Sequence, residues 1–244
     1  MDLKEIIYKR KSTRSYTGEL VSDVTLHQIH KFIAEIKPLY PDIKIQSRIV
    51  EKDSVKCILP WIPPQLIAIF SEDKEGAFEN AGFVYQQLDL YLQSLGLGVC
   101  WLGMGRISAQ DILTVQPADN LKFVMLLAFG HPKGNALRSD TTEFKRKALS
   151  EISDQSDERL EPARFAPSSV NSQPWYFTHE EDTIHAYCVS PGFFKAFSLG
   201  DMNKIDMGIA LAHMYVANPE SFRFFKADSV KPLKGYYYVG SFTL

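Results

Sequence analysis

Residues 166–175 have the sequence Ala-Pro-Ser-Ser-Val-Asn-Ser-Gln-Pro-Trp, which is the most distinctive stretch of the chain. The two prolines fix φ at their own positions and disfavour helical backbone in the residue before each of them. Between them, Ser168, Ser169, Asn171 and Gln173 offer small polar side chains. A capping loop would explain the serines but not the whole string. We therefore expect a rigid polar loop followed by a strand, of the kind that forms the edge of a pocket for a flat ligand.

The segment 10–14, Arg-Lys-Ser-Thr-Arg, places three cations and two hydroxyls in five positions. If the segment is extended, Arg10, Ser12 and Arg14 lie on one face, because side chains alternate along a strand. Two guanidinium groups on either side of a hydroxyl suit a phosphate. If the segment is helical, Arg10 and Arg14 are like charges one turn apart, which repel weakly, and the segment is a solvated basic helix end. The residues alone leave both alternatives open.

The apolar spacing around these two segments predicts alternating helices and strands. The longest helix is expected over 77–95, because a proline-free stretch there is followed by Gly96. Further helices are expected over 3–8, 22–36, 109–113 and 203–217, strands over 43–50, 66–70, 123–129, 175–178, 183–189 and 236–242, and a glycine-rich turn over 98–105. This mixture of elements indicates an α+β fold.

An acidic stretch separates the chain into two parts. Residues 150–161 contain five acidic side chains and one basic one, and almost no apolar side chains. Such a composition is typical of a connection between packed regions. We therefore expect a linker there, between a first half of residues 1–149 and a second half of residues 162–244.

The order of expected elements recurs across this linker. When Gly82 is set against Gly208, the two long helices have similar apolar faces, and strand 123–129 corresponds to strand 236–242. The similarity is weak residue by residue, but the shared order of elements predicts an internal duplication.

The composition excludes several classes of protein. Of the 244 residues, 45% are hydrophobic and 23% are charged, which is typical of a soluble globular protein and not of a disordered or collagen-like chain. The 27 Lys and Arg residues nearly balance the 29 Asp and Glu residues, so no overall positive field is available for a nucleic acid. The N-terminus has no signal-peptide pattern, and the apolar run 123–129 is far shorter than the ~20 residues of a spanning helix. We expect a cytoplasmic protein without a membrane or nucleic-acid partner.

Other sites are also disfavoured by the sequence. The three cysteines form no C-x-x-C pair, so neither a disulfide framework nor a zinc site is expected. There is no G-x-G-x-x-G motif after an expected strand and no P-loop. His27 and His30 share a helical face but lack an evident third ligand. We expect no bound metal.

Four stretches together carry a resemblance to a known family. Residues 166–177 resemble the signature loop of the nitroreductase superfamily, whose members bind FMN, and residues 10–14 resemble the Arg-x-Ser-x-Arg start of that family. Residues 98–103 resemble the stretch whose backbone amides approach flavin N5, and residues 145–149 resemble the family's basic phosphate-binding cluster. The resemblance implies an α+β fold of three α/β/α layers with a mixed, mostly antiparallel sheet.

The order of these motifs departs from the usual layout of the family. There the proline-serine loop follows the Arg-x-Ser-x-Arg segment closely, whereas here about 150 residues separate them. In the usual homodimer, one subunit supplies the basic cluster and the N5 stretch, and its partner supplies the loop. The layout here resembles a subfamily in which both partners are fused into one pseudo-dimeric chain. This implies two related halves, one FMN per chain and a monomer, with a homodimer as the open alternative.

The resemblance also implies a role for each matching residue. The phosphate is expected to be neutralised by Arg10, Arg14 and Arg146, with Lys145 or Lys147 assisting, and Lys11 is expected to belong to the same cofactor site. Ser12 is expected on the ring side, the amides of Leu102, Gly103 and Met104 at N5, and Pro167, Ser168, Ser169 and Asn171 at the opposite edge. No catalytic side chain is expected, because a flavin carries its own chemistry.

The implied activity is transfer of hydride from NADH or NADPH to a flat organic acceptor, such as a nitroaromatic or a quinone, by a ping-pong mechanism. Three alternatives stay open: a relative that consumes reduced FMN, a protein that senses or stores FMN without turnover, and an α+β interaction protein that binds no flavin.

Overall fold

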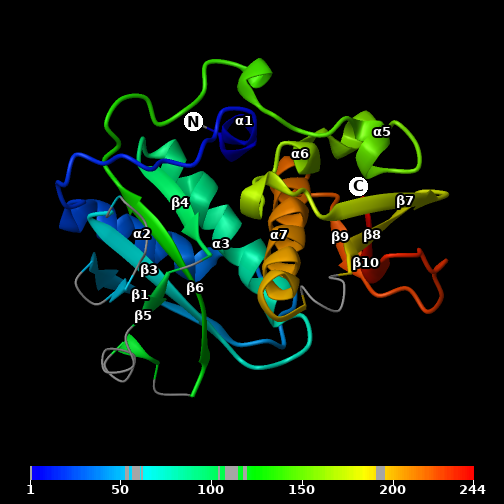
Figure 1. Cartoon of the computed structure of the whole chain (residues 1–244), viewed down its shortest axis with the longest axis horizontal. Coiled ribbons are helices and arrows are strands. Elements are labelled where there is room, and N and C mark those ends of the chain that lie inside the picture. The colour runs from blue at the N-terminus through cyan, green and yellow to red at the C-terminus, as the bar shows by residue number, and fades with distance from the viewer. Residues whose placement is uncertain are drawn as a thin grey trace. The chain divides into compact units, whose positions relative to one another are not determined.

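The computed structural model describes residues 2–52, 55–56, 61, 63–103, 105–107, 115–117, 120–190 and 196–244 (Figure 1). The chain forms two compact units. Unit 1 consists of Met1–Ala77 and Gln87–Glu143, and unit 2 of Phe78–Gln86 and Phe144–Leu244. Among the described residues, no helix has the length and apolar character needed to cross a membrane.

Unit 1 is built around a four-stranded sheet with the order β1-β3-β6-β4, in which each neighbouring pair is antiparallel. These strands are β1 (Ile45–Glu51), β3 (Gln65–Ser71), β4 (Gly98–Leu102) and β6 (Lys122–Gly130), and a small second sheet pairs β2 (Val55–Lys56) with β5 (Arg106–Ile107). The helices are α1 (Leu3–Ile7), α2 (Asp23–Glu35), the C-terminal part of α3 (Ala77–Ser94) and the short η2 (Thr141–Glu143). Every position of β3 is buried, which explains its continuous apolar sequence.

Local signals set the helix ends of unit 1 where the sequence predicts them. The Ser22 hydroxyl accepts a hydrogen bond from the Thr25 N–H at 3.3 Å and so caps the start of α2. After α3, Gly96 has φ +82°, a conformation that favours glycine. There the N–H of Leu97 donates back to the Leu92 carbonyl at 3.1 Å, which closes the helix end.

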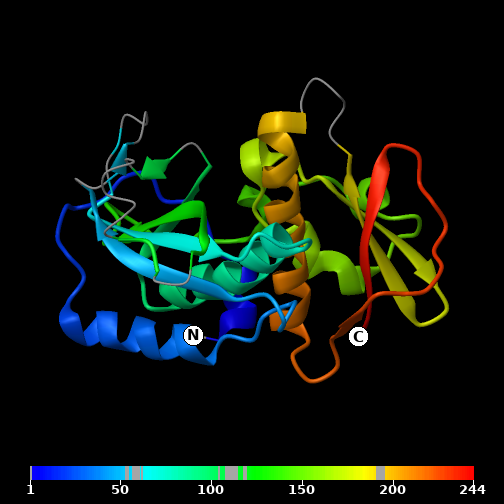
Figure 2. The ribbon, with the colours of Figure 1, turned by 90° about the horizontal axis from the view of Figure 1, so that it is seen from below.

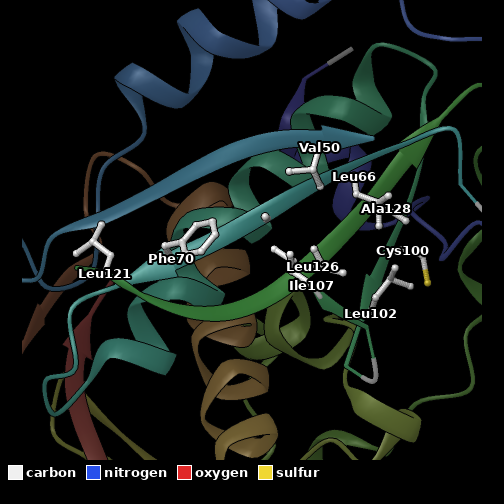
Figure 3. Packing of buried hydrophobic residues seen from close by; sticks show 10 residues of the cluster. Val50, Leu66, Phe70, Cys100, Leu102, Ile107, Leu121, Leu126 and Ala128 are labelled. Carbon is white, nitrogen blue, oxygen red and sulfur yellow. The ribbon is translucent and has the colours of Figure 1, made fainter. Parts of the chain in front are cut away.

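One face of this sheet carries a tightly packed apolar cluster (Figure 3). Alternate residues of β3 face it, because side chains alternate along a strand. Its buried members are Val50, Leu66, Ala68, Phe70, Cys100, Leu102, Ile107, Leu121, Leu126 and Ala128. The cluster holds β4 against β6, so the position of the β4 strand is set by the core of unit 1.

Unit 2 has its own four-stranded antiparallel sheet, with the order β7-β8-β10-β9. Its strands are β7 (Trp175–Glu180), β8 (Thr183–Val189), β9 (Arg223–Phe225) and β10 (Tyr236–Thr243), and its helices are α5 (Leu149–Ile152), η3 (Glu158–Leu160), α6 (Glu161–Arg164), η4 (Ser169–Asn171) and α7 (Ala196–Ala217). Helix α7 runs beside this sheet (Figure 2). It is tied to β8 by a hydrogen bond of 3.4 Å from the Asn203 side chain to the Val189 carbonyl.

The two sheets have the same topology. In chain order, β1, β3, α3, β4 and β6 correspond to β7, β8, α7, β9 and β10, and with this correspondence the strand orders β1-β3-β6-β4 and β7-β8-β10-β9 are identical. The segments before the first strands also correspond, since α2 precedes β1 and α6 precedes β7.

Within unit 2, the first part of α3 meets α7 at two glycines. A Cβ at Gly82 would lie 2.1 Å from the carbonyl oxygen of Ile205, and a Cβ at Gly208 would lie 1.9 Å from that of Glu79. Each contacted residue lies three positions before the opposite glycine. The contact is therefore reciprocal, and it pairs the two glycines that the sequence comparison sets against each other.

Some elements differ from the expectations. Residues 98–102 form the strand β4 and not a turn, and Gly98 serves a close approach, since a Cβ there would lie 2.5 Å from the Thr13 side chain. The expected linker 150–161 is ordered within unit 2, and its few apolar side chains, Ile152 and Leu160, are fully buried. The expected helix 109–113 lies outside the described residues.

Other differences concern the sheets and their ends. The named strands pair only antiparallel, and parallel pairing among the described residues is confined to isolated bridges between Ser12 and Val99 and between Ser153 and Phe177. The single mixed sheet that was expected is thus replaced by separate antiparallel sheets. Helix α7 begins at Ala196, before the expected start at 203, and the short β9 was not predicted.

Candidate functional site

The loop between α6 and β7, residues 165–174, has a strained backbone. Val170, Asn171 and Gln173 have φ values of +47°, +57° and +49°. Such values are uncommon for residues other than glycine, and for a β-branched residue they are a genuine outlier. The Val170 side chain is 89% exposed, so packing of this side chain does not offset the strain. Strain of this kind persists where the surroundings enforce it, and it concentrates at functional sites.

Hydrogen bonds within the loop fix its shape. The Gln173 N–H donates to the Ser168 hydroxyl at 2.8 Å, and the Asn171 N–H donates to the Ser168 carbonyl at 3.0 Å. The Gln173 side-chain amide donates to the Asn171 carbonyl at 3.2 Å. Ser168, whose own backbone is extended at φ −146° and ψ 160°, therefore closes the loop, and Pro167 before it has a fixed φ.

The basic segment 145–147 lies along this loop within unit 2. Arg146 Nη1 donates to Asn171 Oδ1 at 2.6 Å, and Asn171 Nδ2 donates back to the Lys145 carbonyl at 2.8 Å. Lys147 Nζ donates to the Gln173 carbonyl at 3.0 Å. The structure thus brings together Lys145, Arg146 and Asn171, which the sequence assigns to one site.

Asp206 of α7 accepts hydrogen bonds from the backbone of the loop. The Ser169 N–H points at both carboxyl oxygens, at 3.0 and 2.9 Å, and the Ser169 hydroxyl donates to Met202 Sδ at 3.4 Å. Burial raises the pKa of the Asp206 carboxyl from 3.8 to about 8, against the opposing effect of the Ser169 N–H. The carboxyl group is therefore largely protonated at neutral pH. The sequence analysis missed Asp206, although a lone acid within the apolar run 205–212 is a signal for it.

Two polar atoms next to the loop are buried without a hydrogen-bond partner among the described residues. They are Trp175 Nε1 and Ser172 Oγ. A buried donor left unsatisfied costs about 1–3 kcal/mol, so such groups call for an explanation by a ligand or water.

In unit 1, the segment 10–14 is extended and lies against β4. Ser12 forms a parallel bridge with Val99, and the Thr13 N–H donates to the Val99 carbonyl at 2.8 Å. The extended alternative is therefore the one observed. Its cations lie close to Cys100 of β4: burial raises the pKa of the Cys100 thiol, while Arg14 and Arg10 oppose that rise.

The two arginines of this segment have different environments. The Arg10 side chain is 1% exposed, and its Nε donates to Asp89 Oδ1 at 3.3 Å in a buried ion pair. Its Nη2 is buried and has no hydrogen-bond partner in the part of the chain that the structure describes, and its carbonyl accepts from Arg138. Arg14 is exposed and forms no ion pair with any described residue. Of the two, Arg14 is the one whose charge faces solvent.

The remaining predicted residues lie near these segments of unit 1. The Lys11 N–H donates to the Gln93 side chain at 3.0 Å. Leu102 is buried at the end of β4, and the Gly103 carbonyl accepts from Arg106 at 3.2 Å. Met104 lies outside the described residues.

Comparison with known proteins gives a consistent family. A family model described as "Putative TM nitroreductase" matches residues 2–218. The crystal structure of a "putative nitroreductase" from Thermotoga maritima MSB8 has a TM-score of 0.64, with 17% identity over 99% of this chain and 92% of that chain. The similarity extends along nearly the whole of both chains and shows that they share a fold.

Other solved structures match part of the chain. A nitroreductase family protein from Clostridium difficile 630 has a TM-score of 0.49, with 17% identity over 62% of this chain and 96% of that chain. A nitroreductase from Desulfovibrio desulfuricans, solved in complex with FMN, has a TM-score of 0.45, with 23% identity over 61% of this chain and 93% of that chain. No curated protein sequence matches the chain.

Proposed function

Because the chain belongs to the nitroreductase family, whose model spans residues 2–218, we propose that it is an FMN-dependent oxidoreductase. The observation that carries the proposal is the strained loop 165–174 and its hydrogen bonds to the basic segment 145–147. A polar loop joined to a cationic segment suits a ligand that combines a planar polar ring with a phosphate.

The donor set of this chain fits FMN. Arg14 and Lys145 are exposed, and neither they nor Lys147 form an ion pair with a described residue. Their charge is available to a phosphate dianion. The unsatisfied Ser172 hydroxyl and Trp175 N–H add neutral donors beside the loop, as the polar edge of a flavin ring requires.

The residues of each unit have their own roles in this proposal. Within unit 2, Lys145 and Arg146 are phosphate ligands, Lys147 adds positive charge, and Pro167, Ser168, Ser169 and Asn171 are ring contacts. Within unit 1, Arg14 is a phosphate ligand, Lys11 adds positive charge, and Ser12 and the backbone amides of residues 102–104 are ring contacts. Arg10, buried against Asp89, acts by fixing the segment that carries Ser12 and Arg14.

When bound, FMN supplies the hydride chemistry between NADH or NADPH and a flat acceptor such as a nitroaromatic or a quinone, in a ping-pong cycle. The chain supplies position and electrostatics. Positive charge and N–H donors stabilise negative charge that develops on a bound ring. No side chain is required to act as an acid or base.

The duplicated topology supports a single cofactor per chain. Both sheets have the same strand order, as expected for two fused copies of one ancestral subunit. Only the second copy has the proline-serine loop, and only the first has the Arg-x-Ser-x-Arg segment. One complete set of motifs predicts one FMN in a pseudo-dimeric chain.

The flavin absorbance of the purified protein tests this proposal. We expect one FMN per chain after reconstitution, bleaching of its absorbance by NADH or NADPH, and recovery on addition of a nitroaromatic or quinone. Two FMN per chain, or none, would contradict the proposal. A flavin that binds but is not reduced would favour sensing or storage.

A further inference from the structure

The Asp206 carboxyl group joins helix α7 to the backbone at the centre of the strained loop. It is 4% exposed, and both oxygens lie within 3.0 Å of the Ser169 nitrogen. Ser169 directly precedes Val170 and Asn171, two of the three residues with positive φ. The hydrogen bond to Asp206 therefore holds the backbone directly before the residues with unfavourable φ values.

Burying a carboxyl group at position 206 costs desolvation free energy, which an apolar side chain at this position would not cost. The surrounding residues of α7 are buried and mainly apolar, including Ile205, Met207 and Ile209. A buried polar group is tolerated when it makes a hydrogen bond that the structure needs. The bond that Asp206 makes is to the loop and not to its own helix.

The other long helix gives a natural comparison. When Gly82 is set against Gly208, the residue at the place of Asp206 is Asn80, which is also buried. An amide is thus compatible with a helix site of this kind, and like a carboxyl group it offers one oxygen that accepts a hydrogen bond.

We propose that Asp206 is a positioning residue that holds residues 168–173 in the strained conformation used for cofactor binding. The inference rests on the proposed function for its final step only. An accepting oxygen at position 206 is the essential feature: it fixes the Ser169 N–H, and through it the direction of the backbone at Val170 and Asn171.

Hydrogen exchange of the full chain without added flavin tests the holding role. In Asp206→Ala, we expect the amides of residues 168–173 to exchange at least about tenfold faster, since losing this bond removes protection worth that factor. Asp206→Asn is expected to stay within about threefold of wild type, because its side-chain oxygen still accepts. Asp201→Ala is the matched control, since it removes an exposed carboxylate from the same helix.

A second pair of variants tests the donor of this hydrogen bond, the Ser169 N–H, in place of its acceptor. Ser169→Pro deletes the N–H without touching α7, and the backbone of Ser168 is already extended, at φ −146° and ψ 160°, as a residue before proline requires. Ser169→Ala keeps the N–H and loses only the hydroxyl. We expect faster loop exchange in Ser169→Pro than in Ser169→Ala. If Asp206→Ala does not fold, the comparison of Ser169→Pro with Ser169→Ala still tests whether this hydrogen bond holds the loop.

Titration with FMN tests the consequence for the cofactor. We expect Asp206→Ala to weaken FMN binding at least about tenfold, Asp206→Asn to restore binding close to wild type, and Asp201→Ala to change nothing. Wild-type affinity in Asp206→Ala, or equal loss in Asp206→Ala and Asp206→Asn, would overturn the inference. If the wild-type chain binds no FMN, the proposed function fails, and the exchange measurements still decide whether Asp206 holds the loop.

Discussion

The loop 165–174 of unit 2 and the segment 36–44 of unit 1 have the same place in two identical topologies. Each connects a helix to the first strand of a four-stranded sheet. In the segment 36–44 no residue has a positive φ, and Leu39 and Ile43 are buried. In the loop 165–174, three residues other than glycine have positive φ, and Val170 is exposed.

The comparison shows which features of the loop 165–174 the sheet topology does not require. Segment 36–44 shows that a chain can enter the first strand of this sheet with relaxed backbone and apolar contacts. The strain of the loop 165–174 is therefore not a requirement of the fold. Its polar side chains and its bonds to residues 145–147 and Asp206 indicate that the strain belongs to the site.

The strongest test concerns the two glycines at which the long helices α3 and α7 meet. Gly82→Ala and Gly208→Ala each place a Cβ within 2.1 Å of a backbone carbonyl oxygen, so we expect each to lower the free energy of unfolding by at least about 3 kcal/mol. Urea denaturation measures this. A clear difference between the two variants would show that the reciprocal contact is not equivalent on its two sides.

Substitutions in the segments proposed to bind the cofactor should instead change ligand affinity. Arg14→Ala removes an exposed cation and is expected to weaken FMN binding by about 1.5–3 kcal/mol, the usual contribution of a charged hydrogen bond. Its melting temperature should not change. Arg48→Ala, at an exposed site of β1, is the matched control. Equal FMN affinity in the two variants would remove Arg14 from the site.

The pH dependence of stability tests the environment of Asp206. Its pKa is raised by burial from 3.8 to about 8, so the folded state holds the proton more tightly than the unfolded state. The stabilising contribution is complete below pH 3.8 and is lost as pH rises toward 8. Asp206→Asn cannot ionise, so its stability relative to wild type should rise by several kcal/mol between pH 4 and pH 8, at about 1.4 kcal/mol per unit of pKa shift.

Thermal unfolding between pH 4 and 8 measures this difference. The Cys188 thiol of β8 interacts electrostatically with Asp206 and is a titratable neighbour from another element. It is unchanged in Asp206→Asn, so parallel pH profiles of variant and wild type would contradict a buried, protonated Asp206.

The smallest expected effect is relief of strain at Val170. Val170→Asn keeps the backbone but introduces a residue that tolerates positive φ, so we expect about 0.5–1 kcal/mol of added stability. Val24→Asn is the control, because Val24 is also exposed, at 73%, and lies in a helix. Added stability in both variants would point to a general effect of removing exposed valine.

The elements that the sequence predicted well are those with a local signal. β3 and β6 are continuous apolar runs, and α3 ends at a glycine with positive φ. β4 was mistaken for a turn because its glycine serves a contact with Thr13, which lies far away in sequence. α5 and η3 were missed because two buried side chains, Ile152 and Leu160, anchor an otherwise acidic stretch.

In the candidate site too, the parts with a local sequence signal were predictable and the parts that depend on distant partners were not. Its polar loop and basic segment stand out by composition, and the structure joins them in unit 2. The roles of Arg10 and Asp206 depend on partners that no spacing reveals. Asp89 is 79 residues from Arg10, and Asp206 is 37 residues from Ser169.

The reciprocal glycine contact has a consequence for mutation. In an assembly of two identical chains, a single gene position would supply both glycines and both of the residues two places before them, so any mutation would act twice. In one continuous chain these are separate positions. Asn80 and Asp206 can therefore differ while Gly82 and Gly208 are the same, and a substitution of Asp206 leaves Asn80 unchanged.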